Sequence, residues 1–394
     1  MKNNFAIFLI ALGAMTLITR SCDSGDENTD PIIDGIEIDS DISENTTWES
    51  GNVYVLDGRI AVKNGVTLTI EPGVIVKARA GTGVNASALL VARGGKIMAE
   101  GTASAPIIFT TLVDEIEPGE VASPNLEPVL NGLWGGLIIL GNAPISADAA
   151  SVQIEGIPPS DINGLYGGDK SDDNSGILKY ISIRHGGANI GEGNEINGLT
   201  LGGVGSETII ENIEIVANQD DGIEWFGGSV NVTNVVVWNT GDDAIDADQA
   251  WSGTLDNFII INPGDECFEL DGAEGIATAR HTIRNGSVYA GNSEGLADLD
   301  NYGAGDPGNS FVEMKNIYFF GLKYGQTFDD NPAELTASMI EATLPSDTLS
   351  LSDFFLKGTD AYVKEVATNS VGADVSKFKD WSWAAVSGAL DDFE

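Results

Sequence analysis

Three acidic pairs follow one another at nearly equal spacing in the middle of the chain. The first members of successive pairs are 22 and 23 residues apart. Closely spaced carboxylates supply the hard oxygen ligands that calcium prefers. The pattern predicts a calcium site, with these ligands: Asp220, Asp221, Asp242, Asp243, Asp265 and Glu266.

A second set of acids lies just after each pair. Glu224, Asp246 and Glu269 each follow an apolar residue that should point inward, so their own side chains should point outward. Strands in adjacent coils are about 4.8 Å apart, which would place the three carboxylates in one column. Alignment of the flanking segments puts Thr200 before the column and Ala297 after it. We expect these three acids to bind a ligand.

The same stretch allows a catalytic alternative. The string GDDAID (241–246) is similar to the GDD motif of β-helical polygalacturonases, in which neighbouring aspartates act as acid and base. The resemblance implies Asp242, Asp243 and Asp246 as catalytic residues. The HG and R-x-K elements of that family have no counterpart downstream, because His281 is followed by Thr and Arg284 by Asn. Binding is therefore favoured over catalysis.

The elements that position these acids form a repeat. A step of about 22 residues with apolar, β-rich content is typical of one coil of a solenoid. Each coil contains an apolar strand with alternating side chains, such as Ile213/Ile215, and an asparagine introduces the strand. Asparagine tolerates a left-handed backbone and can bond the asparagine of the next coil. These asparagines are Asn212, Asn234, Asn257, Asn285 and Asn316.

The repeat also predicts on which side of the sheet its aromatic residues and its cysteine lie. Trp225 should point into the core, whereas Phe226 and Trp238 are candidates for an outward surface on which a sugar could stack. Trp238 therefore joins the predicted ligand-binding residues. Cys267 is expected at an outward position as a lone, partly covered thiol.

Short β-branched runs broken by Gly and Pro make up the N-terminal third. GVTLTIEPGVIVKA (65–78), GLWGGLIILGNAPI (132–145) and the closing FKDWSWAAVSGAL (378–390) resemble a family of right-handed parallel β-helix surface lipoproteins from the Bacteroidota. Most of the chain resembles this family. The resemblance implies an all-β fold and an outer-membrane location more strongly than it implies an activity.

The first residues have the pattern of a lipoprotein signal peptide. Lys2 and an apolar run over residues 5–18 precede Ser21 and Cys22, and the apolar run is too short to span a membrane. We expect cleavage after residue 21 and lipidation of Cys22. The acidic residues that follow are similar to a surface-export signal. An ordinary secretory signal is the alternative.

Charge excludes several classes of partner. The chain has 19 basic and 60 acidic residues, for a formal net charge of −41. Nucleic-acid binding requires basic clusters, and adsorption to an anionic membrane is disfavoured for the same reason. The membrane should be contacted only through the lipid anchor. A polysaccharide or a TonB-dependent outer-membrane transporter are the partners that we expect.

The predicted organisation is a signal peptide (1–21), an acidic flexible tether (22–45), a parallel β-helix (46–331) and a partly helical C-terminal cap (332–394). Residues 113–129 and 147–177 should form loops that project from the stack. Helical spacing at 330–344 and a short segment at 361–366 predict helices in the cap, which should cover the open last coil.

The sequence thus predicts a surface-exposed outer-membrane lipoprotein that binds an extracellular polysaccharide or a partner outer-membrane protein, with calcium in its acidic coils. A polysaccharide lyase or glycoside hydrolase of β-helix type is one alternative. An adhesin or surface-layer component is another, because one β-helix architecture supports many functions.

Overall fold

The computed structural model describes residues 35–188, 196–355 and 361–393. The predicted signal peptide, Cys22 and most of the predicted tether lie outside the described residues. None of the described helices has the length and hydrophobicity that a membrane crossing requires.

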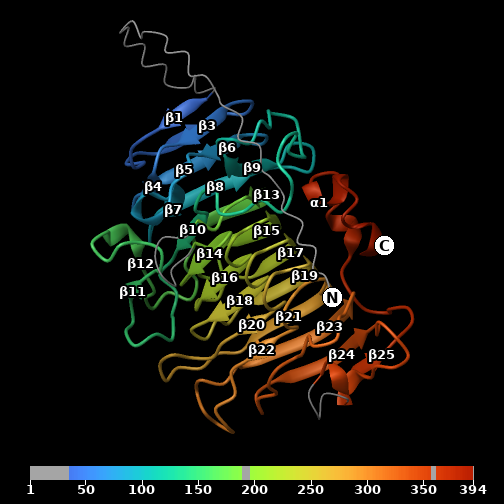
Figure 1. Ribbon diagram of the computed structural model, residues 1–394. Helices are drawn as coiled ribbons and strands as arrows, with labels where there is room; N and C mark the ends of the chain where they lie inside the picture. Colours follow the sequence, from blue (N-terminus) through green and yellow to red (C-terminus); the bar gives the residue numbers. More distant parts are fainter. Residues whose placement is uncertain (1–34, 189–195, 356–360, 394) are drawn as a thin grey trace, which may run out of the picture. The chain divides into compact units, whose positions relative to one another are not determined.

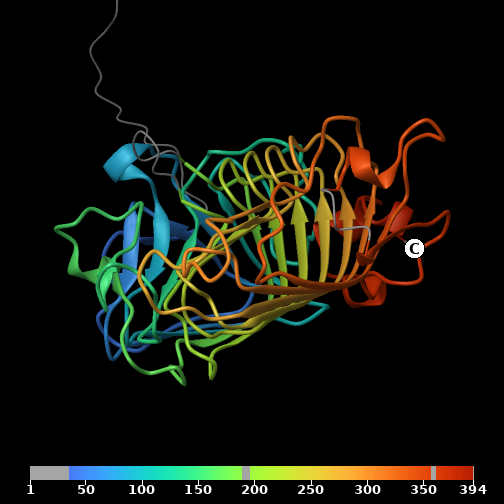
Figure 2. The ribbon, with the colours of Figure 1, turned by 90° about the horizontal axis from the view of Figure 1, so that it is seen from below.

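Parallel strands stacked coil upon coil make up the described chain (Figure 1). Among the described residues one sheet, here called sheet A, has 15 strands, and a second, sheet B, has 8. A chain that returns in the same direction in every coil winds into a right-handed parallel β-helix. Figure 2 shows the long strands of sheet A side by side and pointing the same way. The predicted fold class is confirmed.

The strands of sheet A are β1 (Ile36–Ile38), β2 (Thr46–Trp48), β3 (Val53–Leu56), β5 (Thr67–Ile70), β6 (Ile75–Ala78), β8 (Lys96–Glu100), β9 (Ile107–Thr111), β13 (Gly176–Arg184), β15 (Ile209–Val216), β17 (Val232–Trp238), β19 (Thr254–Ile261), β21 (His281–Tyr289), β23 (Val312–Phe320), β24 (Thr336–Ala342) and β25 (Val363–Glu365). Those of sheet B are β4 (Arg59–Val62), β7 (Ala88–Val91), β10 (Leu137–Leu140), β14 (Leu199–Gly202), β16 (Ile223–Phe226), β18 (Ile245–Asp248), β20 (Glu269–Leu270) and β22 (Asp298–Leu299).

Helical elements are few and short. They are η1 (Gly83–Asn85), η2 (Ile162–Gly164), η3 (Leu351–Asp353), η5 (Val375–Lys377), α1 (Trp383–Val386) and η6 (Asp391–Phe393). A small antiparallel pair, β11 (Val152–Gln153) and β12 (Leu165–Tyr166), lies within an insertion.

The asparagine ladder forms as predicted except between Asn257 and Asn285, where Asn285 donates to Asp256 instead. All five asparagines have left-handed backbone angles, with φ between 56° and 60°. Asn234 Nδ2 donates to Asn212 Oδ1 at 3.0 Å, and Asn257 Nδ2 donates to Asn234 Oδ1 at 2.7 Å. Asn316 donates to Asn285 in the same way, at 2.8 Å. The ladder bends each long strand of sheet A at the same place while it bonds successive coils together.

The core lies between the two sheets. The alternating residues of β15, β17 and β19, such as Ile213, Val235 and Phe258, are fully buried in it. Trp225 also points inward and stacks on Trp251, with ring centroids 4.4 Å apart, as predicted. Stacked apolar layers of this kind stabilise each coil through its neighbours.

The C-terminal third differs from the prediction. Residues 336–342 form strand β24 and residues 363–365 form β25, although helices were expected. Met339 has φ of 56°, which continues the bend of the sheet and is incompatible with a helix. Pairing with the exposed edge of β23 thus outweighs the helical spacing. Parallel pairing begins at β1 and ends at β25, so the stack extends beyond residues 46–331 at both ends.

The last residues cover a sheet face. Residues 373–393, here called the C-terminal segment, place Phe378, Trp381 and Trp383 against the outer face of sheet A. Their partners there include Val236 and Ile259. Figure 1 shows this segment in red beside the sheet. The segment packs on that face because the outer side chains of β15, β17 and β19 there are themselves apolar.

Candidate functional site

The predicted carboxylate column forms on the outer face of sheet B. Glu224 on β16 pairs with Asp246 on β18, which pairs with Glu269 on β20. Thr200 precedes the column as predicted. The next position is occupied by Asp298, however, and not by Ala297. The loop between β20 and β22 is longer than the earlier ones, which shifted the alignment by one residue, and the column therefore has a fourth acid.

An insertion covers the upper part of this face. Residues 141–175, here called the covering insertion, place Ile154, Ile157 and Tyr166 in an apolar cluster against sheet B. Phe226 packs under it, with its ring centroid 6.0 Å from that of Tyr166. The predicted projecting loop at 147–177 is therefore packed on the sheet, and Phe226 is not a surface for stacking.

Burial changes the chemistry of the column. Glu224 is 5% exposed and Asp246 is 7% exposed. Together with Asp221, they form the buried carboxylate group, in which one oxygen from each residue lies within 4.8 Å of the others. Burial raises the pKa of Glu224 and of Asp246 well above the usual range. Repulsion adds to this effect, first from Glu155 in the case of Glu224 and first from Glu224 in the case of Asp246. Three charges cannot remain there unless protons or a cation compensate them.

One polar side chain next to this group was missed by the sequence reasoning. Asn197 is fully buried and donates its Nδ2 hydrogen to Glu224 Oε2. Among the described residues its Oδ1 has no hydrogen-bond partner, and neither has Oδ1 of Asp246. Asn197 precedes β14 at the position that aligns with Asp221 in the next coil, so the repeat that placed Thr200 could also have indicated Asn197.

The six predicted metal ligands do not meet at one point. Asp220 and Asp242 lie with Asp221 in a second set of three acids, which shares Asp221 with the buried carboxylate group. Asp243, Asp265 and Glu266 belong to neither set. The physical reason is that the six acids lie in pairs in the turns of three successive coils, so the pairs are separated along the stack.

Two of the turn aspartates have a structural role. Asp221 Oδ1 accepts the backbone N–H of Asp243 at 3.0 Å, and Asp243 Oδ1 accepts that of Glu266 at 2.6 Å. The Asp243 carboxyl also hydrogen-bonds Glu269, and burial and this contact raise its pKa to about 11. Asp243 is thus a corner residue that connects coils. The candidate catalytic trio is divided, since Asp242, Asp243 and Asp246 face different partners.

Next to the column lies a cleft of about 490 Å³, lined by residues that follow the column positions, such as Asp248 and Asp271. Its charged lining residues are all acidic and form the acidic cleft: Asp248, Asp271, Glu274, Asp300 and Asp306. Tyr302, which is 67% exposed, supplies an aromatic ring at the rim.

Electrostatics in the acidic cleft follow from its crowding. Burial, followed by repulsion from Asp300 and Glu269, raises the pKa of Asp271 to about 7. Asp248 lies on β18 two positions after Asp246 and hydrogen-bonds Asp271. Cleft and column are therefore parts of one acidic face. Carboxylates in such an open cleft can accept hydrogen bonds from sugar hydroxyls or bind cations.

Trp238 does not join this face. It lies on β17 in sheet A, where its ring contacts Trp383 of the C-terminal segment. Cys267 is also misplaced by the sequence reasoning, because it is fully buried in the core and burial raises its pKa to about 12. It precedes the first residue of β20, so strand alternation does not apply to it.

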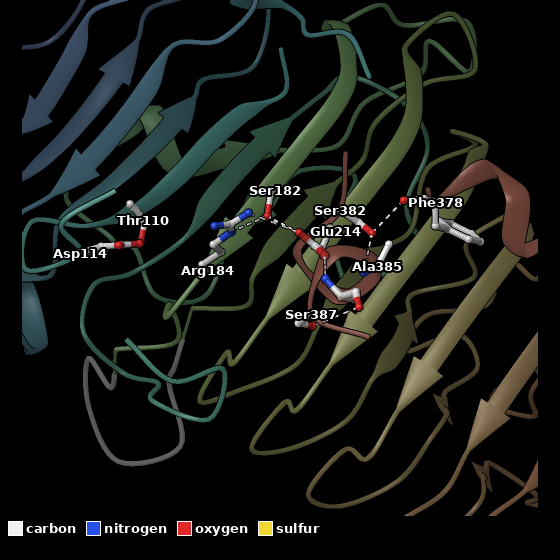
Figure 3. A network of polar contacts seen from close by, with 10 residues as sticks. Thr110, Asp114, Ser182, Arg184, Glu214, Phe378, Ser382, Ala385 and Ser387 are labelled. Carbon is white, nitrogen blue, oxygen red and sulfur yellow. Dashed lines mark hydrogen bonds and ion pairs between the residues drawn. The ribbon is translucent and has the colours of Figure 1, made fainter. Parts of the chain in front are cut away.

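A second polar network lies beneath the C-terminal segment (Figure 3). Arg184 and Glu214 are both fully buried and form an ion pair at 3.7 Å. Ser182 Oγ donates to Glu214 Oε2 at 2.6 Å and accepts from Arg184 Nε at 2.7 Å. Glu214 Oε1 accepts the backbone N–H of Ala384 at 2.8 Å. The network thus fixes the C-terminal segment to sheet A.

Comparison with known families gives one match. Residues 40–385 match the model of a pectate-lyase-like β-helix domain. Comparisons with curated proteins and with solved structures found no match. The matched range includes the acidic face, the covering insertion and most of the C-terminal segment.

Proposed function

The chain belongs to the family of pectate-lyase-like β-helix domains, a carbohydrate-related β-helix family, and we propose from this that it binds an extracellular polysaccharide in the acidic cleft, with calcium at the neighbouring carboxylates. The observation that carries the proposal is an open cleft whose charged lining residues are all acidic and include Asp248 and Asp271, each two positions after a residue of the carboxylate column.

Calcium suits the donors that are present. The oxygens of Asp221, Glu224 and Asp246 lie within 4.8 Å of one another, a separation that a hard cation with ligands at about 2.3–2.6 Å can bridge. The unpartnered Oδ1 atoms of Asp246 and Asn197 supply further oxygen. When bound, calcium would compensate the buried charges and order this part of the column.

A polysaccharide would then be held by the open part of the face. Asp271 and Asp300 can accept hydroxyl hydrogens, and the ring of Tyr302 can stack against a sugar. An acidic polysaccharide would be repelled by these carboxylates unless cations lay between them. We therefore propose that uronate-containing chains bind only when calcium is present.

Binding is favoured over cleavage by the distribution of the acids. Cleavage by paired carboxylates requires both to flank one glycosidic bond. Asp243 is engaged by the backbone of Glu266 and by the side chain of Glu269, and Asp246 is buried. Neither residue lines the acidic cleft.

The lipid anchor at Cys22 and display on the outer membrane belong to the same proposal, and the sequence pattern around Cys22 supports them. A surface lipoprotein that captures polysaccharide could pass it to a transporter of the TonB-dependent kind. Palmitate labelling of a Cys22→Ala variant in cells tests the anchor.

Retention of the full chain on immobilised polysaccharides tests the binding function. We expect retention on polygalacturonate or alginate in calcium, loss of retention in EGTA, and loss in an Asp271→Asn, Asp300→Asn double variant. Asp347→Asn, which changes an exposed acid elsewhere, is the control. Reducing ends or unsaturated uronate released into solution would instead assign an enzyme, and retention unchanged in the double variant would exclude the acidic cleft.

A further inference from the structure

A second cleft lies on the other sheet, between the loop 123–128 and the C-terminal segment. Its volume is about 510 Å³. Trp238 and Trp383 line it, and we call it the tryptophan cleft. We propose that this cleft binds a neutral pyranose unit of a saccharide, an inference that rests on the carbohydrate-binding function proposed above.

Both indoles are placed to contact a ligand. Their rings meet edge to face, with centroids 5.9 Å apart and planes at 74°. Trp238 is 9% exposed and Trp383 is 4% exposed. In the part of the chain that the structure describes, neither indole N–H has a hydrogen-bond partner. Neither N–H is among the buried atoms that lack a partner, so both reach solvent and can donate to the oxygen acceptors of a ligand.

Trp383 is held rigidly from behind. The Arg184 guanidinium carbon lies 4.9 Å from the centre of its ring, and the His185 ring contacts it at 5.7 Å. The backbone N–H of the following residue, Ala384, donates to Glu214. Ser382 caps the short helix α1, in which Trp383 is the first residue. A ring fixed in this way loses little freedom when a ligand binds.

The charge of the lining selects the ligand class. Among the described residues that line the cleft, Glu127 alone is ionisable, and its side chain is exposed. A uronate would be repelled by Glu127 and by the net charge of −41. A neutral pyranose offers a C–H face to the indoles and hydroxyls to Glu127, Ser387 and the indole N–H groups. The cleft volume lies within the range of small-molecule sites.

Calorimetry of the full chain with neutral hexasaccharides of glucose, mannose, galactose and xylose tests the proposal. We expect one of them to bind and the Kd to rise about three- to tenfold in Trp238→Phe and in Trp383→Phe, because each change removes one donor and keeps a ring. Trp48→Phe alters a core tryptophan outside the cleft and should leave the Kd unchanged. Failure of all four sugars to bind overturns the proposal.

A blocking variant covers the case in which a tryptophan variant unfolds. Ser387 is exposed on the rim, and Ser387→Trp should fill the entrance without disturbing the core. Loss of hexasaccharide binding is expected, and unchanged binding places the sugar elsewhere. The same samples are assayed for calcium-dependent retention on polygalacturonate. If the chain is retained on polygalacturonate but binds no hexasaccharide, only the tryptophan-cleft proposal is wrong. If it binds a hexasaccharide but is not retained on polygalacturonate, only the acidic-cleft proposal is wrong.

Discussion

Replacement of Asp246 by Asn tests the buried carboxylate group with almost no change in side-chain size. In the absence of metal the group contains three acids that repel one another and are removed from water. Asn cannot ionise, so it removes the cost of keeping Asp246 charged or protonated in this group, and it can still donate to a neighbouring carboxylate. In EGTA at neutral pH, the free energy of unfolding of Asp246→Asn should therefore be at least as high as that of the wild type.

Calcium should reverse this order. At a concentration 100 times its Kd, a ligand specific for the folded state adds about 2.7 kcal/mol to the free energy of unfolding. With an unfolding entropy of about 2.1 cal/mol/K per residue, that gain raises the Tm of a unit of this length by about 3 to 4 °C. Asp246→Asn removes a ligand from the site and should lose most of the rise.

Differential scanning calorimetry in calcium and in EGTA measures both effects. Asp347→Asn, at an exposed position, controls for the loss of one negative charge. It should show the full calcium-induced rise. Equal rises in the wild type and in Asp246→Asn would refute the assignment of calcium to this group.

Other predictions concern the ladder, the buried ion pair and the acidic cleft. Asn257→Ala should lower the free energy of unfolding by about 2–4 kcal/mol in urea titrations, because it strains a left-handed residue and removes hydrogen bonds. Asn257→Gly should lower it less, because glycine adopts the left-handed backbone without strain. Equal losses in the two variants would contradict the conformational role of the ladder. Glu214→Ala leaves Arg184 buried without its partner and should lower the free energy of unfolding by about 3–5 kcal/mol. Glu211→Ala, which removes a surface ion pair, should lower it by less than about 1 kcal/mol. Similar losses in the two variants would argue against the buried network. Folded Asp271 keeps its proton up to pH about 7, whereas the unfolded residue loses it near pH about 4. Asp271 should thus make the free energy of unfolding in EGTA fall as the pH rises from 4 to 7. Asp271→Asn should make that slope shallower by about 1.4 kcal/mol per pH unit. An unchanged slope would show that the pKa of Asp271 is not raised.

Local periodicity predicted much of the stack from the sequence. The near-constant step placed Glu224, Asp246 and Glu269 in register, and the asparagines marked the left-handed bends. Both features repeat with one coil, so neighbouring coils impose the same register. Where the step changed, before β22, the alignment missed Asp298.

Features that depend on distant segments were not predictable. Alternation places Glu224 outward, but it does not reveal that the covering insertion packs over it and excludes water. Trp238 was likewise an outward aromatic residue, and only the fold shows that Trp383 meets it. The apolar spacing of residues 330–344 fits a helix, but residues 336–342 form a strand because they pair with β23.

The most direct test of calcium-dependent polysaccharide capture is the Kd of an oligogalacturonate for the full chain, measured by calorimetry in calcium and in EGTA. Calcium that neutralises the acidic face should lower the Kd at least about tenfold, and reciprocal titration should show the same coupling for calcium. An oligogalacturonate that binds equally well in both buffers, or is cleaved during the titration, would contradict the account.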